Sequence, residues 1–89
     1  MAQHNRFILR NDLSRPLTLN IEPEGAHFEL RKGEEVFVID DFASLPVTLK
    51  LTESETSGPI ISIWPGDGVV TVEKDGVNVF DLVQGEVTA

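Results

Sequence analysis

The stretch Pro16–Leu30, PLTLNIEPEGAHFEL, decides the fold because it alternates apolar and polar residues on both sides of a turn. Apolar side chains occupy every second position from Leu17 to Ile21. Phe28 and Leu30 resume the same period after a Pro-Glu-Gly break. A two-residue period is typical of a β-strand with one buried face. The stretch therefore predicts two strands whose apolar faces share one core.

The same period recurs along the chain, with turn residues about every 8–12 positions, and no segment shows the period of a helix. The expected strands are Arg6–Arg10, Pro16–Glu22, Ala26–Leu30, Glu35–Asp40, Val47–Thr52, Ile60–Trp64 and a hairpin over Val69–Leu82. The sequence predicts one all-β domain over residues 1–89, a small antiparallel β-sandwich or partly open barrel of about seven to eight short strands. Residues 1–5 are expected as a frayed tail and residues 53–58 as a mobile loop.

The hairpin can be given a register because Asp75-Gly76 suits a two-residue type I′ turn. Lys74 then lies opposite Val77. One face collects Val70, Val72, Val77 and Val79, and the other collects Val69, Thr71, Phe80 and Leu82. Since both faces are largely apolar, we expect one to meet the core and the other to meet something else, such as a neighbouring protomer.

Composition excludes several classes of function. Fifteen acidic residues against seven basic ones give a net charge of −8, which disfavours nucleic-acid and anionic membrane partners. The chain has no cysteine, so disulfides and thiolate metal sites are excluded. No apolar run suits a signal peptide or a membrane span, and a cytoplasmic protein is expected.

One group of side chains could hold a metal ion. Glu22, Glu24 and His27 surround the Pro-Glu-Gly turn, and carboxylate and imidazole donors at a turn could bind zinc or nickel weakly. The alternative is an exposed histidine on the polar face of a strand. The sequence leaves open whether the three side chains converge, and no cofactor is expected.

Catalytic residues are not apparent. Asp40 and Asp41 could serve a small hydrolase, but neighbours in a strand point to opposite faces. His27 lacks a nucleophile motif around it. Trp64, at the end of the apolar strand Ile60–Trp64, could cap the core or offer an aromatic platform to a sugar, peptide or subunit. Together with Trp64, the hairpin residues Phe80 and Leu82 are the candidate binding residues.

The run from Asn11 to Val38 resembles small, functionally uncharacterised bacterial all-β proteins with an EP-x-G, F-x-L and G-E signature. The matching residues are Glu22-Pro23-Glu24-Gly25, Phe28–Leu30 and Gly33-Glu34. The resemblance covers about a third of the chain and implies turn chemistry, with no activity attached. The cadence of Gly33–Val36 is also similar to that of cupredoxin-like sandwiches, whose copper ligands this sequence lacks.

The sequence therefore favours a non-enzymatic binding or assembly module, one that self-associates through apolar β-strand surface. A small-ligand or metal-binding protein using Glu22, Glu24 and His27 is the second hypothesis, and a hydrolase using Asp40 or Asp41 is the third.

Overall fold

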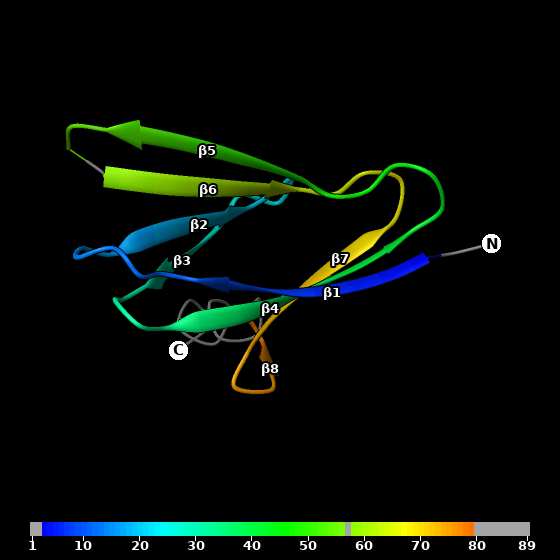
Figure 1. The fold of residues 1–89 in the computed structure, drawn as a ribbon. Helices are drawn as coiled ribbons and strands as arrows, with labels where there is room; N and C mark the ends of the chain where they lie inside the picture. Colours follow the sequence, from blue (N-terminus) through cyan, green and yellow to red (C-terminus); the bar gives the residue numbers. More distant parts are fainter. Residues whose placement is uncertain (1–2, 57, 80–89) are drawn as a thin grey trace, which may run out of the picture.

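The computed structural model describes residues 3–56 and 58–79, which form two four-stranded sheets packed face to face (Figure 1). The first sheet has the order β1 (Gln3–Arg10), β4 (Glu35–Phe42), β7 (Val69–Lys74), β8 (Val77–Asn78). The second has the order β3 (Ala26–Leu30), β2 (Leu17–Ile21), β6 (Gly58–Trp64), β5 (Thr48–Ser54). The predicted all-β sandwich is confirmed, and its sheets do not close into a barrel. The sequence predicted antiparallel pairing throughout, and this is wrong for one pair, because β2 and β6 run parallel.

Strand boundaries differ from the sequence prediction at two places. Strand β1 begins at Gln3, so residues 3–5, expected as a tail, pair with residues 40–42 of β4. Strand β5 runs to Ser54 and β6 begins at Gly58, so the expected loop at 53–58 supplies the ends of two paired strands.

The core lies between the sheets and follows the alternation read from the sequence. Leu17, Leu19 and Ile21 of β2 are buried and share the core with Val36 and Val38 of β4. Each buried side chain of this kind contributes about 1.5–3 kcal/mol relative to an exposed one. The facing rows of β2 and β4 therefore hold the two sheets together.

The C-terminal hairpin has the predicted register. Asp75 and Gly76 both have positive φ, 53° and 82°, as a type I′ turn requires, and Lys74 pairs with Val77. On β7, Val72 is buried in the core, whereas Val69 points to the other side and is 67% exposed. Phe80 and Leu82, predicted to continue the outer face, lie outside the described residues.

The connection from β4 to β5 crosses from one sheet to the other and is held by aspartates. The Asp67 carboxylate accepts hydrogen bonds from the main-chain amides of Ala43, Ser44 and Leu45, at 3.0, 2.9 and 3.0 Å. These amides, that of Ser44 foremost, hold the pKa of Asp67 below its ordinary value. Asp40 accepts from the Val47 amide at 2.9 Å. These hydrogen bonds fix the main chain of residues 43–47, and so they fix where β5 begins.

The Pro-Gly-Asp-Gly turn packs its backbone directly against this crossing. A Cβ atom at Gly68 would lie 1.6 Å from the main-chain oxygen of Asp41, and one at Gly66 would lie 1.9 Å from that of Leu45. No side chain fits at those distances. The Gly-Asp-Gly sequence is thus required for close backbone packing, with Asp67 serving as the anchor between the two glycines.

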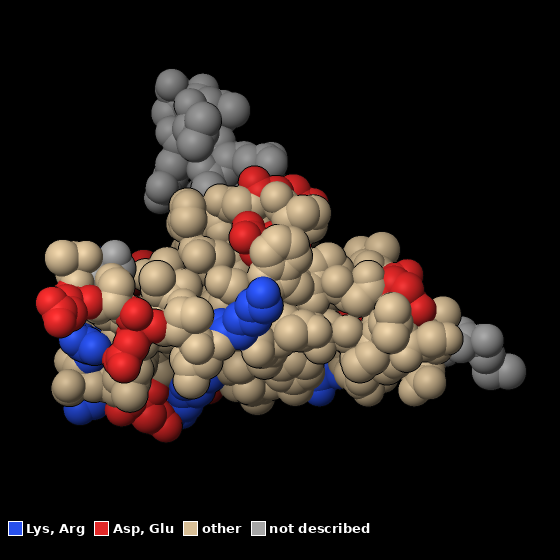
Figure 2. Space-filling view, turned by 90° about the horizontal axis from the view of Figure 1, so that it is seen from above, with Lys and Arg blue, Asp and Glu red and all other residues tan. Residues whose placement is uncertain are grey.

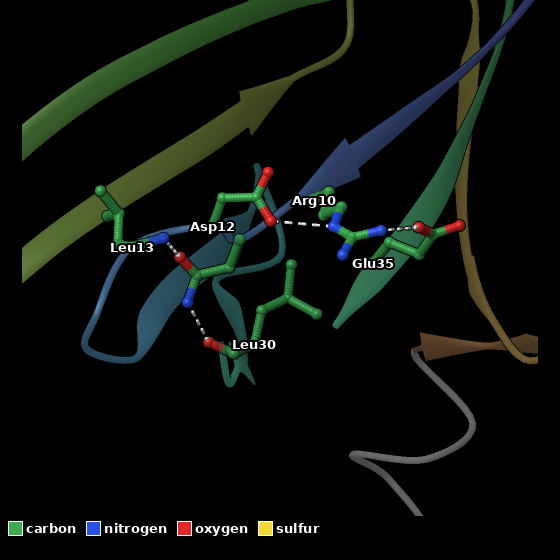
Figure 3. A network of polar contacts seen from close by, with 6 residues as sticks. Arg10, Asp12, Leu13, Leu30 and Glu35 are labelled. Atoms are coloured by element: carbon green, nitrogen blue, oxygen red, sulfur yellow. Dashed lines mark hydrogen bonds and ion pairs between the residues drawn. The ribbon is translucent and has the colours of Figure 1, made fainter. Parts of the chain in front are cut away.

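At the opposite end of the molecule, Asn11 organises the connection between β1 and β2. It is buried; its side-chain amide donates to the main-chain oxygens of Leu30 and Arg15, and its oxygen accepts from the Leu13 amide. Figure 3 shows the hydrogen bonds that join this side chain to the main-chain nitrogen of Leu13 and the main-chain oxygen of Leu30. Arg10 pairs with Asp12 beside it, at the surface. Asn11 therefore sets the path of residues 12–15.

Candidate functional site

Among the described residues, strand β5 forms one edge of its sheet. In the order of the second sheet it is terminal, with β6 as its hydrogen-bonded neighbour, and all seven of its residues are exposed. Among residues 3–56 and 58–79, no strand pairs with the outer main-chain N–H and C=O groups of residues 48–53, which can therefore accept another strand. Such edges invite strand addition unless proline, a bulge or charge blocks them. Within Thr48–Ser54 there is no proline, and the only cation is Lys50.

The face of β5 that continues the core is apolar and uncovered. Leu49 and Leu51 pair with Ile63 and Ile61 of β6 and share their side of the sheet. Ile63 is fully buried, yet Leu49 is 40% and Leu51 74% exposed. Figure 1 shows β5 and β6 extending past β1, the edge strand of the first sheet. The leucines overhang because the facing sheet ends before it reaches them.

A third leucine adjoins this overhang. Leu13, 48% exposed, lines a groove of about 460 Å³ together with Leu51. The other lining residues are Arg15, Thr52, Glu53 and Pro59. We call Leu13, Leu49 and Leu51 the β5 edge patch. Viewed from the β5 side, uncharged surface is interrupted by basic atoms near the middle and by acidic atoms at the upper edge and the right, and charged groups are densest at the left end (Figure 2).

The position of Leu13 depends on Asn11. The buried Asn11 side chain accepts from the Leu13 amide at 2.8 Å and donates to the Arg15 oxygen at 2.9 Å. Both residues line the groove. A buried polar side chain with three hydrogen bonds therefore builds one wall of the candidate site.

The long edge strand of the first sheet differs from β5. On the core side of β1, Phe7 and Leu9 are partly buried against the core. Its outer face carries Arg6, whose guanidinium lies 4.2 Å from the Phe37 ring centroid, and Arg10, which pairs with acids. Cationic side chains of this kind protect an edge against added strands. Of these two long edges, β1 carries two arginines and β5 a single lysine, so β5 is the less protected.

The outer face of the second sheet is polar. His27 contacts the Asn20 side chain at 2.5 Å, and Asn20 pairs across the sheet with Ser62, which pairs with Lys50. Trp64 lies on the same face, with the Lys50 ammonium 5.7 Å from its ring centroid. Trp64 is 37% exposed, which is more than expected for a buried cap on the core and less than expected for a fully open aromatic platform.

The predicted metal ligands are only partly brought together. Glu22 and Glu24 line one pocket of about 200 Å³ with Pro65 and Val69, whereas His27 lies on the sheet face beside Asn20. Within residues 3–56 and 58–79, no group of three histidine, aspartate or glutamate side chains is placed to hold a metal ion.

The two candidate hydrolase carboxylates point to opposite faces, as the sequence predicts. Asp40 is fully buried and bound to the Val47 amide, and its second oxygen has no hydrogen-bond partner in the described structure. Asp41 is on the outer face, where it contacts His4. Because their side chains lie on opposite faces of β4, the two carboxylates are not placed to act together on one substrate.

Comparisons with protein-family models, curated proteins and solved structures give no match to this chain. In the described part of the chain, no helix is long and apolar enough to cross a membrane.

The alternation of Val47–Thr52 predicts that Leu49 and Leu51 face the core, so sequence reasoning overlooks them as a binding surface. Their direction is correct, but the first sheet does not cover them. Leu13 offered a signal of its own, since it is an apolar residue inside a polar turn, Asn11–Arg15.

Proposed function

We propose that this protein is a non-enzymatic binding and assembly module that accepts an additional β-strand on the edge of β5. The observation that carries the proposal is the combination of an open edge with exposed leucines on its core-side face. An added strand would satisfy the free main-chain groups of β5. Its own apolar side chains would complete the overhanging core.

The energetic argument rests on the exposed apolar area and on the weak protection of the β5 edge, which carries a single cation, Lys50. Fully covering a leucine contributes about 1.5–3 kcal/mol, so the β5 edge patch offers several kcal/mol before the cost of ordering the partner. Edge hydrogen bonds add direction and register. The partner is therefore an extended segment with apolar residues at alternate positions.

Chemical-shift mapping tests this proposal. The probe is a capped peptide with the β5 sequence TLKLTES, titrated into the ¹⁵N-labelled protein. We expect saturable shifts confined to β5, Leu13 and the end of β6, with a Kd in the range of about 10 μM to 1 mM for so short a strand.

Two variants make the test specific. Leu51→Lys places a charge in the patch and should abolish the shifts. Val69→Lys adds the same charge at a similarly exposed valine of the first sheet and should leave the shifts unchanged. Shifts that persist in Leu51→Lys, or that map to the first sheet, would contradict the proposal, as would no shift at millimolar peptide.

A further inference from the structure

We propose that the occupant of the β5 edge is a second copy of this chain, which adds its own β5 antiparallel across a two-fold axis at Leu51. This inference rests on the proposed function and assigns its partner. The pairing would join the two second sheets into one eight-stranded sheet. Such an interface is isologous, so each copy gives and receives the same contacts.

Register follows from which residues meet. Residues directly opposite each other in an antiparallel pair point to the same face, so a symmetric pairing must centre on a residue. A centre at Lys50 sets that ammonium against its own copy, and like charges directly opposite are destabilising. A centre at Thr52 sets Leu51 against Glu53 of the second copy. The Lys50 centre still sets Leu49 against Leu51 of the second copy, so its fault is the like-charge contact, whereas the Thr52 centre breaks up the apolar face.

The Leu51-centred register avoids the contact between two ammonium groups and pairs all seven residues of β5 with the second copy. Leu51 meets Leu51 of the second copy, and Lys50 meets Thr52 on the polar face. Leu49 of the second copy then lies opposite Glu53, on the side where Leu13, Leu51 and Pro59 line the groove. Each groove thus receives an apolar side chain from the other copy, and the leucines of the β5 edge patch are covered on both.

The distribution of charge favours β5, over the rest of the acidic surface, as the place where a second copy could approach. The chain carries −8, so two copies repel each other over most of their surface. Around β5 and its groove, Lys50 and Arg15 balance Glu53 and Glu55. The edge is therefore locally neutral within an acidic molecule. Raising the salt concentration should strengthen the association, because salt screens the remaining repulsion.

Single-cysteine variants test the register, since the natural chain has no cysteine to interfere. In the proposed pairing, the two Leu51→Cys residues face each other with Cα atoms about 4.5–5.5 Å apart, which a disulfide spans. Cysteines at Lys50 or Thr52 are diagonal neighbours at about 7–8 Å, beyond easy reach. Two Leu49→Cys residues are about 13 Å apart along the strands.

We expect mild oxidation to yield at least tenfold more covalent dimer from Leu51→Cys than from Leu49→Cys, Lys50→Cys or Thr52→Cys. Val69→Cys, at an exposed position on the other sheet, is the matched control and should stay monomeric. Sedimentation of the natural chain should show the 9.8 kDa species doubling in mass as concentration rises.

The outcomes separate the inference from the proposed function. Preferential dimer from Lys50→Cys or Thr52→Cys would overturn the register. A natural chain that stays monomeric while still binding the strand peptide would overturn the second copy as occupant and leave strand addition standing. A dimer trapped best through Val69→Cys would overturn the β5 interface itself.

Discussion

Replacing Asn11 with alanine removes the polar centre that holds residues 12–15 in place. The side chain makes three hydrogen bonds, to the main-chain oxygens of Leu30 and Arg15 at 2.9 Å each and from the amide of Leu13 at 2.8 Å. A net contribution of about 1 kcal/mol per bond gives about 3 kcal/mol. The buried Leu30 oxygen, left without its partner, makes this a lower estimate.

Thermal unfolding by circular dichroism measures the effect. For a domain of this size, 1 kcal/mol corresponds to about 4–8 °C in Tm, so Asn11→Ala should melt about 12–24 °C lower. Asn11→Asp keeps the oxygen that accepts from Leu13 but loses both donors. It should be at least as destabilising as alanine, because a carboxylate would face two carbonyl oxygens.

A neighbouring substitution is the control. Asp12→Ala breaks an exposed pair with Arg10 and should leave Tm near that of the natural chain. If Asn11→Ala melted within about 3 °C of the natural chain, or if Asn11→Asp were as stable as asparagine, the hydrogen-bonded centre would not be what stabilises this end of the molecule.

Other expectations concern the crossing between the sheets and can be checked by the same melts. Gly68→Ala should lower the free energy of unfolding by about 3 kcal/mol or more, since its methyl group would lie 1.6 Å from a main-chain oxygen. At Gly33 a methyl group would meet no atom within 4 Å, so Gly33→Ala should cost only the strain of its positive φ. Equal losses of stability at the two glycines would refute the packing argument. Because the pKa of Asp67 is lowered on folding, its contribution is present above the ordinary value of 3.8 and is lost as the pH falls through and below it. Asp67→Asn should therefore be less stable at neutral pH, and the difference should shrink below about pH 4; a difference independent of pH would contradict the assigned role.

Much of the fold followed from local patterns, and the candidate site did not. The alternation of apolar residues predicted the buried face of β2, and the Asp75-Gly76 turn predicted the hairpin register. Both features depend on residues that are near each other in the sequence. The grouping of Glu22 and Glu24 without His27 depends on how the chain turns between them. That path is a property of the folded chain, and spacing alone left it open.

By itself, the sequence determined that this chain forms short strands, which side chains point to the core side, and that Asp40 and Asp41 diverge. These are consequences of the two-residue period of an extended backbone. Only the tertiary structure decided that β5 ends its sheet and that the facing sheet stops short of it. Leu49 and Leu51 carry the same pattern as buried leucines of β2. Their exposure is set by the order and offset of strands distant in sequence, which no local period encodes.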